Sequence, residues 1–92
     1  MILDPDSYAL ANAVDALLDE CDDPDHVKPE LLESVLEIAT PPAPDTATAG
    51  THLRALRRSV SEAAERRGLR IGSAGTHPFA RWEDQRVSAD PR

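Results

Sequence analysis

Three glutamates between residues 30 and 40 are the side chains whose types and spacing best suit metal binding. Glu30, Glu33 and Glu37 stand in an otherwise mostly apolar segment. Closely spaced carboxylates repel one another, and a divalent cation relieves that repulsion. Carboxylate oxygens suit magnesium, which also binds nucleotide phosphates. The segment is therefore a candidate magnesium site if the backbone brings these side chains together.

The backbone of residues 30–40 can be interpreted in two ways. As a helix, it would gather its apolar residues on one face and expose the glutamates to solvent on the other. As a strand, it would place Leu36 and Ile38 on one face, with Val35 and Glu37 on the opposite face. Acids on the floor of a sheet would then need cations nearby. The residue pattern alone leaves both interpretations open.

A second candidate site is the loop of residues 75–82, which follows the apolar run 69–74. Pro78 biases His77 towards an extended backbone. A histidine here could act as an acid or base, bind a ligand, or simply bond to the backbone of its loop. The same loop carries the only Phe and the only Trp of the chain. Large aromatic side chains usually anchor a loop, and anchored loops often carry function.

Arg81 and Trp82 end this loop and have two possible roles each. They could stack as a cation–π pair. Separately, Arg81 could face an anionic substrate and Trp82 could pack to hold the loop. Cys21 is a poor nucleophile candidate because acids flank it on both sides, which disfavours the thiolate. We expect no catalytic residue in this chain.

The elements that must position these residues are indicated by periodicity and turn signals. Apolar spacing predicts a helix over residues 9–20. A Pro-rich connection over residues 41–45 precedes a second, longer helix of roughly 46–67. Asp45 or Thr46 can cap that helix, and Gly68 can close it. A strand over residues 69–75 and a polar tail over 83–92, poorly ordered by itself, complete the prediction.

Length, charge and apolar content indicate a single small domain and argue against nucleic-acid and membrane partners. Ninety-two residues make at most one small domain, and its apolar content is rich in Ala, Leu and Val. Residues 1–40 contain eleven acids and one base, a net charge of -10, whereas residues 41–92 contain six acids and nine arginines, a net charge of +3. The acidic half argues against nucleic acid as a partner. We expect no membrane partner, because no apolar run is long enough, and a cytoplasmic location, because no signal peptide is visible.

Three segments together resemble the N-terminal quarter of the glutamate–cysteine ligase-like carboxylate–amine ligases (type 2). They are residues 27–40, 53–58 and 75–81, and their order and spacing carry the resemblance. Members of that family open with a glutamate-rich first strand, and residues 1–6 resemble its tail. The resemblance implies that residues 1–92 are an incomplete N-terminal portion of a ligase domain. The implied fold is α+β: a partial antiparallel sheet with a long helix packed on it, from a glutamine synthetase-like ligase fold.

The resemblance also implies a chemistry, namely ATP-dependent amide formation through an acyl phosphate, with Mg2+ in the complete enzyme. It identifies Glu37 as a metal ligand, with Glu30 and Glu33 as further candidates, and it favours the strand interpretation of this segment. It places His77 and Arg81 in the substrate pocket. The implied partners are an amino-acid substrate, ATP, and the remainder of the ligase or a second chain. By itself the chain is expected to be inactive.

Two other hypotheses remain open at this point. The chain could be a small acidic helical protein-interaction module without catalysis, or a truncated and inactive remnant of the enzyme. A fold prediction distinguishes the ligase hypothesis from the interaction module. If the ligase hypothesis holds, residues 31–39 form a strand paired with residues 69–75, and the long helix joins the two.

Overall fold

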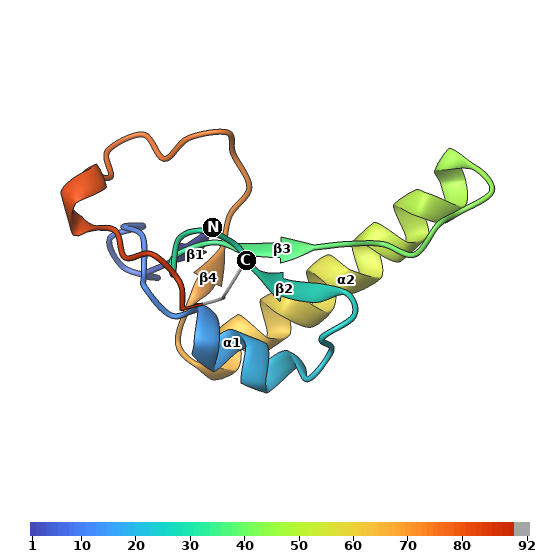
Figure 1. Cartoon of the computed structure of the whole chain (residues 1–92), viewed down its shortest axis with the longest axis horizontal. Coiled ribbons are helices and arrows are strands. Elements are labelled where there is room, and N and C mark those ends of the chain that lie inside the picture. The colour runs from blue at the N-terminus through green and yellow to red at the C-terminus, as the bar shows by residue number, and fades with distance from the viewer. Residues whose placement is uncertain (90–92) are drawn as a thin grey trace.

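The computed structural model describes residues 1–89 and confirms the α+β class. Within these residues the chain forms two α-helices and two separate antiparallel sheets of two strands each (Figure 1). A short 3-10 turn follows near the end of the described chain. The elements in order are β1 Ile2–Leu3, α1 Val14–Cys21, β2 Val27–Pro29, β3 Leu36–Ile38, α2 Thr46–Arg66, β4 Arg70–Ile71 and the turn Trp82–Asp84.

The predicted pairing of the sheet is wrong. Only residues 36–38 of the glutamate segment form a strand, and this strand, β3, pairs with β2 through Lys28 opposite Glu37. The expected partner, β4, pairs with β1 instead, with Ile2 opposite Ile71. A hairpin between neighbouring strands closes a short loop, which costs less chain entropy than a long one. Residues 30–35 contain a bend, a turn and an isolated β-bridge from Leu32 to Val87, but no helix, so the helical interpretation of this segment is also wrong.

Helix α1 begins at Val14, five residues later than its apolar spacing predicts. The preceding residues are held by β1 and its turn: the Ala11 amide donates to the Ile2 carbonyl, and the Asp4 amide donates to Ala9. No side chain caps the helix. The amides of Ala13 and Val14 donate to the carbonyl of Glu33 at 3.0 and 2.9 Å. A long-range carbonyl therefore satisfies the first amides, which sequence periodicity could not reveal.

Helix α2 matches its prediction closely. Asp45 caps it by accepting a 2.7 Å hydrogen bond from the Thr48 amide, and this bond lowers the pKa of the Asp45 carboxyl. Gly68 ends the helix region with φ of +68°, a conformation that side-chain-bearing residues rarely adopt. Neither helix of the described chain is long and apolar enough to cross a membrane.

The core lies where α1 and the C-terminal half of α2 pack against β1. Ile2, Val14, Leu17 and Ala64 form one buried cluster, each at most 1% exposed. The N-terminal half of α2 extends away from this core (Figure 1). Its apolar residue Leu53 is 39% exposed. One helix therefore has a packed end and an open end.

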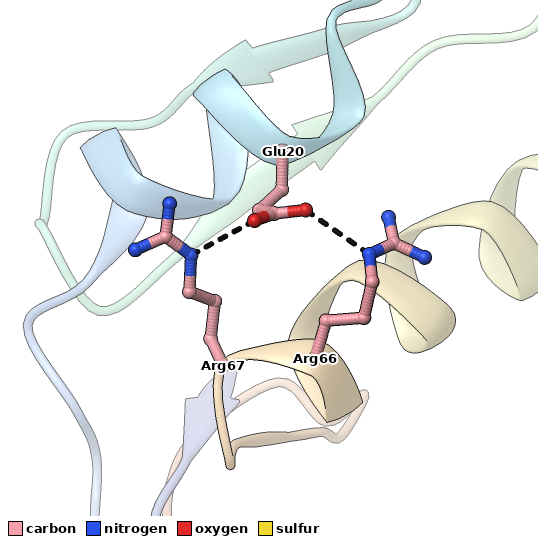
Figure 2. Close-up of polar contacts among 3 residues, drawn as sticks. All are labelled: Glu20, Arg66 and Arg67. Carbon is pink, nitrogen blue, oxygen red and sulfur yellow. Dashed lines mark hydrogen bonds and ion pairs between the residues drawn. The ribbon is translucent and has the colours of Figure 1, made fainter.

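An ion pair network ties the packed end of α2 to α1. Figure 2 shows the Glu20 carboxylate between two arginines: Arg66 Nε lies 3.0 Å from one oxygen and Arg67 Nε lies 3.1 Å from the other. The hydrogen bond from Arg66, with the positive charge of both arginines, lowers the pKa of Glu20. The arginines of the long helix thus serve partly to join the two helices.

Candidate functional site

The candidate site is a largely apolar hollow of about 420 Å³ beside the loop of residues 74–85. It is lined by residues from four parts of the chain, and none of them belongs to α2. The first residue, Met1, lies at its edge, and Val35 contributes from the turn before β3. His77 and Trp82 contribute from the loop itself. The fold thus brings the predicted substrate loop beside the glutamate segment.

His77 holds this loop in place through both of its ring nitrogens. Its Nδ1 accepts hydrogen bonds from the amides of Phe79 and Ala80 at 3.3 and 3.1 Å. Its Nε2 lies 2.7 Å from the carbonyl oxygen of Tyr8, so it must donate there. These partners assign the neutral tautomer with the proton on Nε2. In this arrangement neither nitrogen is free to transfer a proton to a substrate.

Tyr8, which the residue pattern did not single out, completes the support of the loop. Its backbone has φ of +59°, which is uncommon for a bulky residue, and its carbonyl is the one that His77 binds. The turn before it is held by the Asp4 carboxylate, which accepts from the amides of Asp6 and Ser7. The Asp4–Ser7 turn signal could have marked a tight turn here. It could not have shown which distant residue would bind it.

The side chains of Arg81 and Trp82 are largely exposed to solvent. Trp82 is 82% exposed, so the expectation that it packs to anchor the loop is wrong. Phe79, 58% exposed, instead lies edge-on to the His77 ring with 4.4 Å between ring centroids. The Arg81 guanidinium is exposed, with Nε 3.5 Å from a Glu83 carboxylate oxygen. A solvated ion pair of this kind is weak, so Arg81 is available to another anion.

The three candidate metal ligands do not come together. Glu37 is exposed in β3, directly across from Lys28. The Glu30 carboxylate accepts a hydrogen bond from the Leu31 amide at 2.9 Å. Glu33 is half-buried in the turn before β3. Among residues 1–89, no group of three His, Cys, Asp or Glu side chains is placed to hold a metal ion.

Glu37 nevertheless has a defined orientation. Leu36 and Ile38 line a groove over α2, so alternation along β3 turns Glu37 to the opposite face. Val35, the residue before β3, lines the hollow that contains His77. Glu37 therefore lies two residues along the chain from one wall of the candidate site.

The segment after the loop is bound to the glutamate turn by contacts that the polar composition of residues 83–92 did not predict. The buried hydroxyl of Ser34 donates to the Gln85 side-chain oxygen at 2.8 Å. The Glu33 amide donates to the Arg86 carbonyl, and the Ser88 amide donates to Leu31. These bonds fix one rim of the hollow. Residues 90–92 of the predicted tail lie outside the described residues.

With the geometry in place, comparison with known proteins identifies the family. The model of glutamate–cysteine ligase family 2 (GCS2) matches residues 2–92. The chain belongs to this family. The resemblance inferred from three short segments is thereby confirmed over nearly the whole chain. No solved structure matches it.

Similar proteins occur in several bacteria under the name "Putative glutamate--cysteine ligase 2". The chain is 40% identical to the protein from Jannaschia sp. (strain CCS1) over an aligned region of 87 residues, which covers 92% of this chain. It is 33% identical over 94 residues to that from Bordetella avium (strain 197N) and 32% identical over 93 residues to one from Chloroflexus aurantiacus, each covering 99% of this chain. The chain spans only 23–24% of the length of these relatives.

Proposed function

We propose that this chain supplies the N-terminal portion of an ATP-dependent carboxylate–amine ligase of the glutamate–cysteine type, with a glutamine synthetase-like fold. The observation that carries the proposal is the family match over residues 2–92. The reaction joins an acid to an amine after ATP has converted the carboxylate into an acyl phosphate. The alternative hypothesis of a helical interaction module loses its basis, because residues 30–40 contain no helix.

ATP and Mg2+ are the cofactors proposed for the complete ligase. The described residues do not fit a metal site by themselves, because Glu30, Glu33 and Glu37 are not clustered. We therefore propose that Glu37 is the principal ligand from this chain, with Glu30 and Glu33 secondary. The remaining ligands would come from the part of the ligase that this chain does not span. On that basis the chain alone has no turnover.

The proposed contribution to substrate binding comes from the loop that His77 supports. Arg81 is exposed and carries a charge suited to the carboxylate of an amino-acid substrate. His77 lines the hollow, yet both of its nitrogens bind backbone groups. Its proposed role is to shape the pocket around a small substrate and to keep the loop in position.

A chimaeric enzyme tests this function. The matching quarter of the Jannaschia relative is replaced by this chain, and ATP-dependent phosphate release is measured with glutamate and cysteine. Glu37→Gln keeps the side-chain shape and removes the charge. It should lower turnover by at least about a hundredfold, since even residues that only orient metal ligands matter 10–100-fold.

The matched control is Glu62→Gln, which removes the charge of another exposed glutamate, on α2. It should keep turnover within about twofold of the unmodified chimaera. An active chimaera in which Glu37→Gln and Glu62→Gln behave alike would refute the ligand assignment. Phosphate release that never depends on both amino acids would refute the proposed reaction.

A further inference from the structure

One wall of the hollow beside His77 is a short segment, residues 79–82, which we call the flap. Ala80 and Trp82 of the flap line the hollow. Gln85 holds the C-terminal end of the flap: its amide donates to the Trp82 carbonyl at 3.1 Å, and its side chain accepts from a buried serine hydroxyl at 2.8 Å. The ring of His77 holds the N-terminal end. The flap can therefore pivot about Gln85 once the bonds to His77 are lost.

The side chains of the flap bury little surface that would hold it in place. Phe79 is 58% exposed, Trp82 is 82% exposed, and the Arg81 side chain is 73% exposed. Exposed segments with few buried apolar contacts open at a low cost in free energy. Amides released in such a segment bond to water instead. The two hydrogen bonds to the His77 ring therefore matter more here than they would in a packed segment.

The two ring nitrogens of His77 respond differently to an added proton. In the neutral ring, Nε2 donates to the Tyr8 carbonyl at 2.7 Å, and Nδ1 accepts from the amides of Phe79 and Ala80. An imidazolium has hydrogen on both nitrogens and no acceptor. Protonation strengthens the bond to Tyr8, which becomes charge-assisted. It removes both bonds to the flap and sets the new N–H group against two amide hydrogens.

The turn that presents the Tyr8 carbonyl keeps its own charge as histidine titrates. The Asp4 carboxylate accepts from the amides of Ser7 and Asp6 at 3.0 and 2.9 Å, and these bonds lower the pKa of Asp4. Carboxyl groups ordinarily titrate near pH 4. Tyr8 therefore stays in position when the ring gains a proton, and the change is confined to the flap side of the ring.

The groups around His77 offer a charged ring no partner. The ion pairs among residues 1–89 include none with His77. Arg81 of the flap is a permanent cation, and its partner Glu83 lies on the same loop. Among the other residues that line the hollow, Met1 has a titratable group, its terminal amine. This amine donates to the Gly72 carbonyl at 2.7 Å, and burial lowers its pKa. An experiment must therefore separate His77 from this amine.

We propose that His77 is a proton-controlled latch on the flap. Between about pH 7.5 and 5.5, within the range where histidine changes its charge, the ring passes from a neutral form that holds the flap to a charged form that releases it. His77 is thus a positioning residue whose protonation sets the shape of the hollow. Because the hollow is the proposed substrate pocket, the inference rests on the proposed function and adds regulation by pH to it. The movement itself needs neither ATP nor substrate.

NMR of the isotope-labelled chain tests the latch in one titration. At pH 7.5 the His77 ring nitrogens should give the signature of the neutral tautomer with hydrogen on Nε2. As the pH falls to 5.5, the ring should gain a proton, and the amide signals of Phe79 and Ala80 should shift with the same midpoint. Protection of these amides against exchange should fall more than about fivefold. The Leu69 amide, bonded to the Ala64 carbonyl at 2.8 Å, is the reference and should keep its protection within about twofold.

Variants separate His77 from the other titratable groups. Trp82 is the only tryptophan of the chain, so its fluorescence anisotropy reports on the flap. In the unmodified chain the anisotropy should fall between pH 7.5 and 5.5. His77→Gln removes the titrating ring and should leave the anisotropy constant over this range. The matched control, His52→Gln on α2, removes another histidine and should retain the fall.

The latch is overturned if the ring gains its proton while the amides of Phe79 and Ala80 stay unchanged, or if the ring stays neutral throughout the range. It is also overturned if His77→Gln retains the transition, which would assign the change to the Met1 amine or to carboxylates. The ring and the flap are followed in the same unmodified sample, so a variant that does not fold leaves the test decisive. A failed latch would leave the proposed ligase reaction intact, and an inactive chimaera would leave the latch intact.

Discussion

The two ends of α2 carry the same apolar stripe and have opposite environments. At the C-terminal end, Val60 and Ala64 are at most 1% exposed, and Ala64 belongs to the buried cluster with residues of α1 and β1. Nearer the N-terminal end, Leu53 is 39% exposed and lines an open groove. The periodicity of the helix is continuous across both ends. An amphipathic pattern therefore shows that a face needs a partner, and does not show whether this chain supplies it.

The difference also separates the part of this chain that sets its stability from a part that contributes little to it. The packed end holds the buried cluster and the ion pairs of Glu20, so it should determine the free energy of unfolding. The open end lines the groove, and its residues should contribute little to that free energy. Substitutions at the two ends can test this division directly.

The largest effect is expected in the packed cluster. Leu17→Ala removes a fully buried side chain beside Ile2 and Val14, and should lower the free energy of unfolding by about 2–5 kcal/mol. Urea denaturation followed by circular dichroism measures it. A loss below about 0.5 kcal/mol would show that this cluster does not hold the fold together.

Replacing two glycines, Gly68 after α2 and Gly50 within it, by alanine should change the free energy of unfolding in opposite directions. Gly68→Ala places a side chain at φ of +68° and should destabilise the fold by about 1–2 kcal/mol. Gly50→Ala lies within the open half of α2, where its Cβ would meet only the flexible end of Arg54 at 3.4 Å. It should stabilise the helix by about 0.5–1 kcal/mol. If thermal unfolding showed both variants shifting stability in the same direction, this difference between the ends would be contradicted.

The ion pairs of the packed end predict a dependence on pH. The pKa of Glu20 is lowered in the folded chain, chiefly by the Arg66 hydrogen bond. Its stabilisation is therefore present above the usual glutamate pKa and is lost as pH falls through the lower folded value. Stability should decrease from about pH 5 to pH 3, and less steeply in Glu20→Gln.

The control for this prediction is Glu62→Gln on α2. Glu62 is exposed and makes no ion pair among the described residues. It should retain the acid sensitivity of the unmodified chain. The free energy of unfolding of each variant is measured by urea denaturation at each pH. If Glu20→Gln and Glu62→Gln show the same dependence on pH, the role assigned to Glu20 is refuted.

The smallest effect on stability is expected at the open end. Leu53→Ala removes a side chain that is already 39% exposed, so the free energy of unfolding should change by less than about 0.5 kcal/mol. The same urea titration used for Leu17→Ala measures it. A loss as large as that of Leu17→Ala would mean that the groove floor is part of the core.

Local signals were sufficient where the responsible contacts are near in sequence. The cap at Asp45 binds an amide three residues away, and Gly68 needs only its own backbone freedom, so α2 was predicted closely. The strand at residues 36–38 was anticipated from alternation together with the family resemblance. That resemblance, carried by motifs, also identified the family that the comparison confirmed.

The predictions that failed depend on distant residues. The start of α1 is set by the Glu33 carbonyl, and the partner of β4 is β1 rather than β3. For His77, the pattern left a reactive role and a structural role equally open. The bond to Tyr8, sixty-nine residues away, showed that its nitrogens are both engaged with the backbone.

By itself, therefore, the sequence determined the long helix, the α+β class, the family and the types of side chain available for chemistry. These depend on local propensity, periodicity and motif spacing, which are properties of neighbouring residues. Only the tertiary structure decided which strands pair, where Glu37 and His77 lie, and which half of α2 is left open. Those outcomes depend on competition among long-range hydrogen bonds and buried surfaces. A periodic pattern shows that a face of an element must be buried, but it does not identify the residues that bury it.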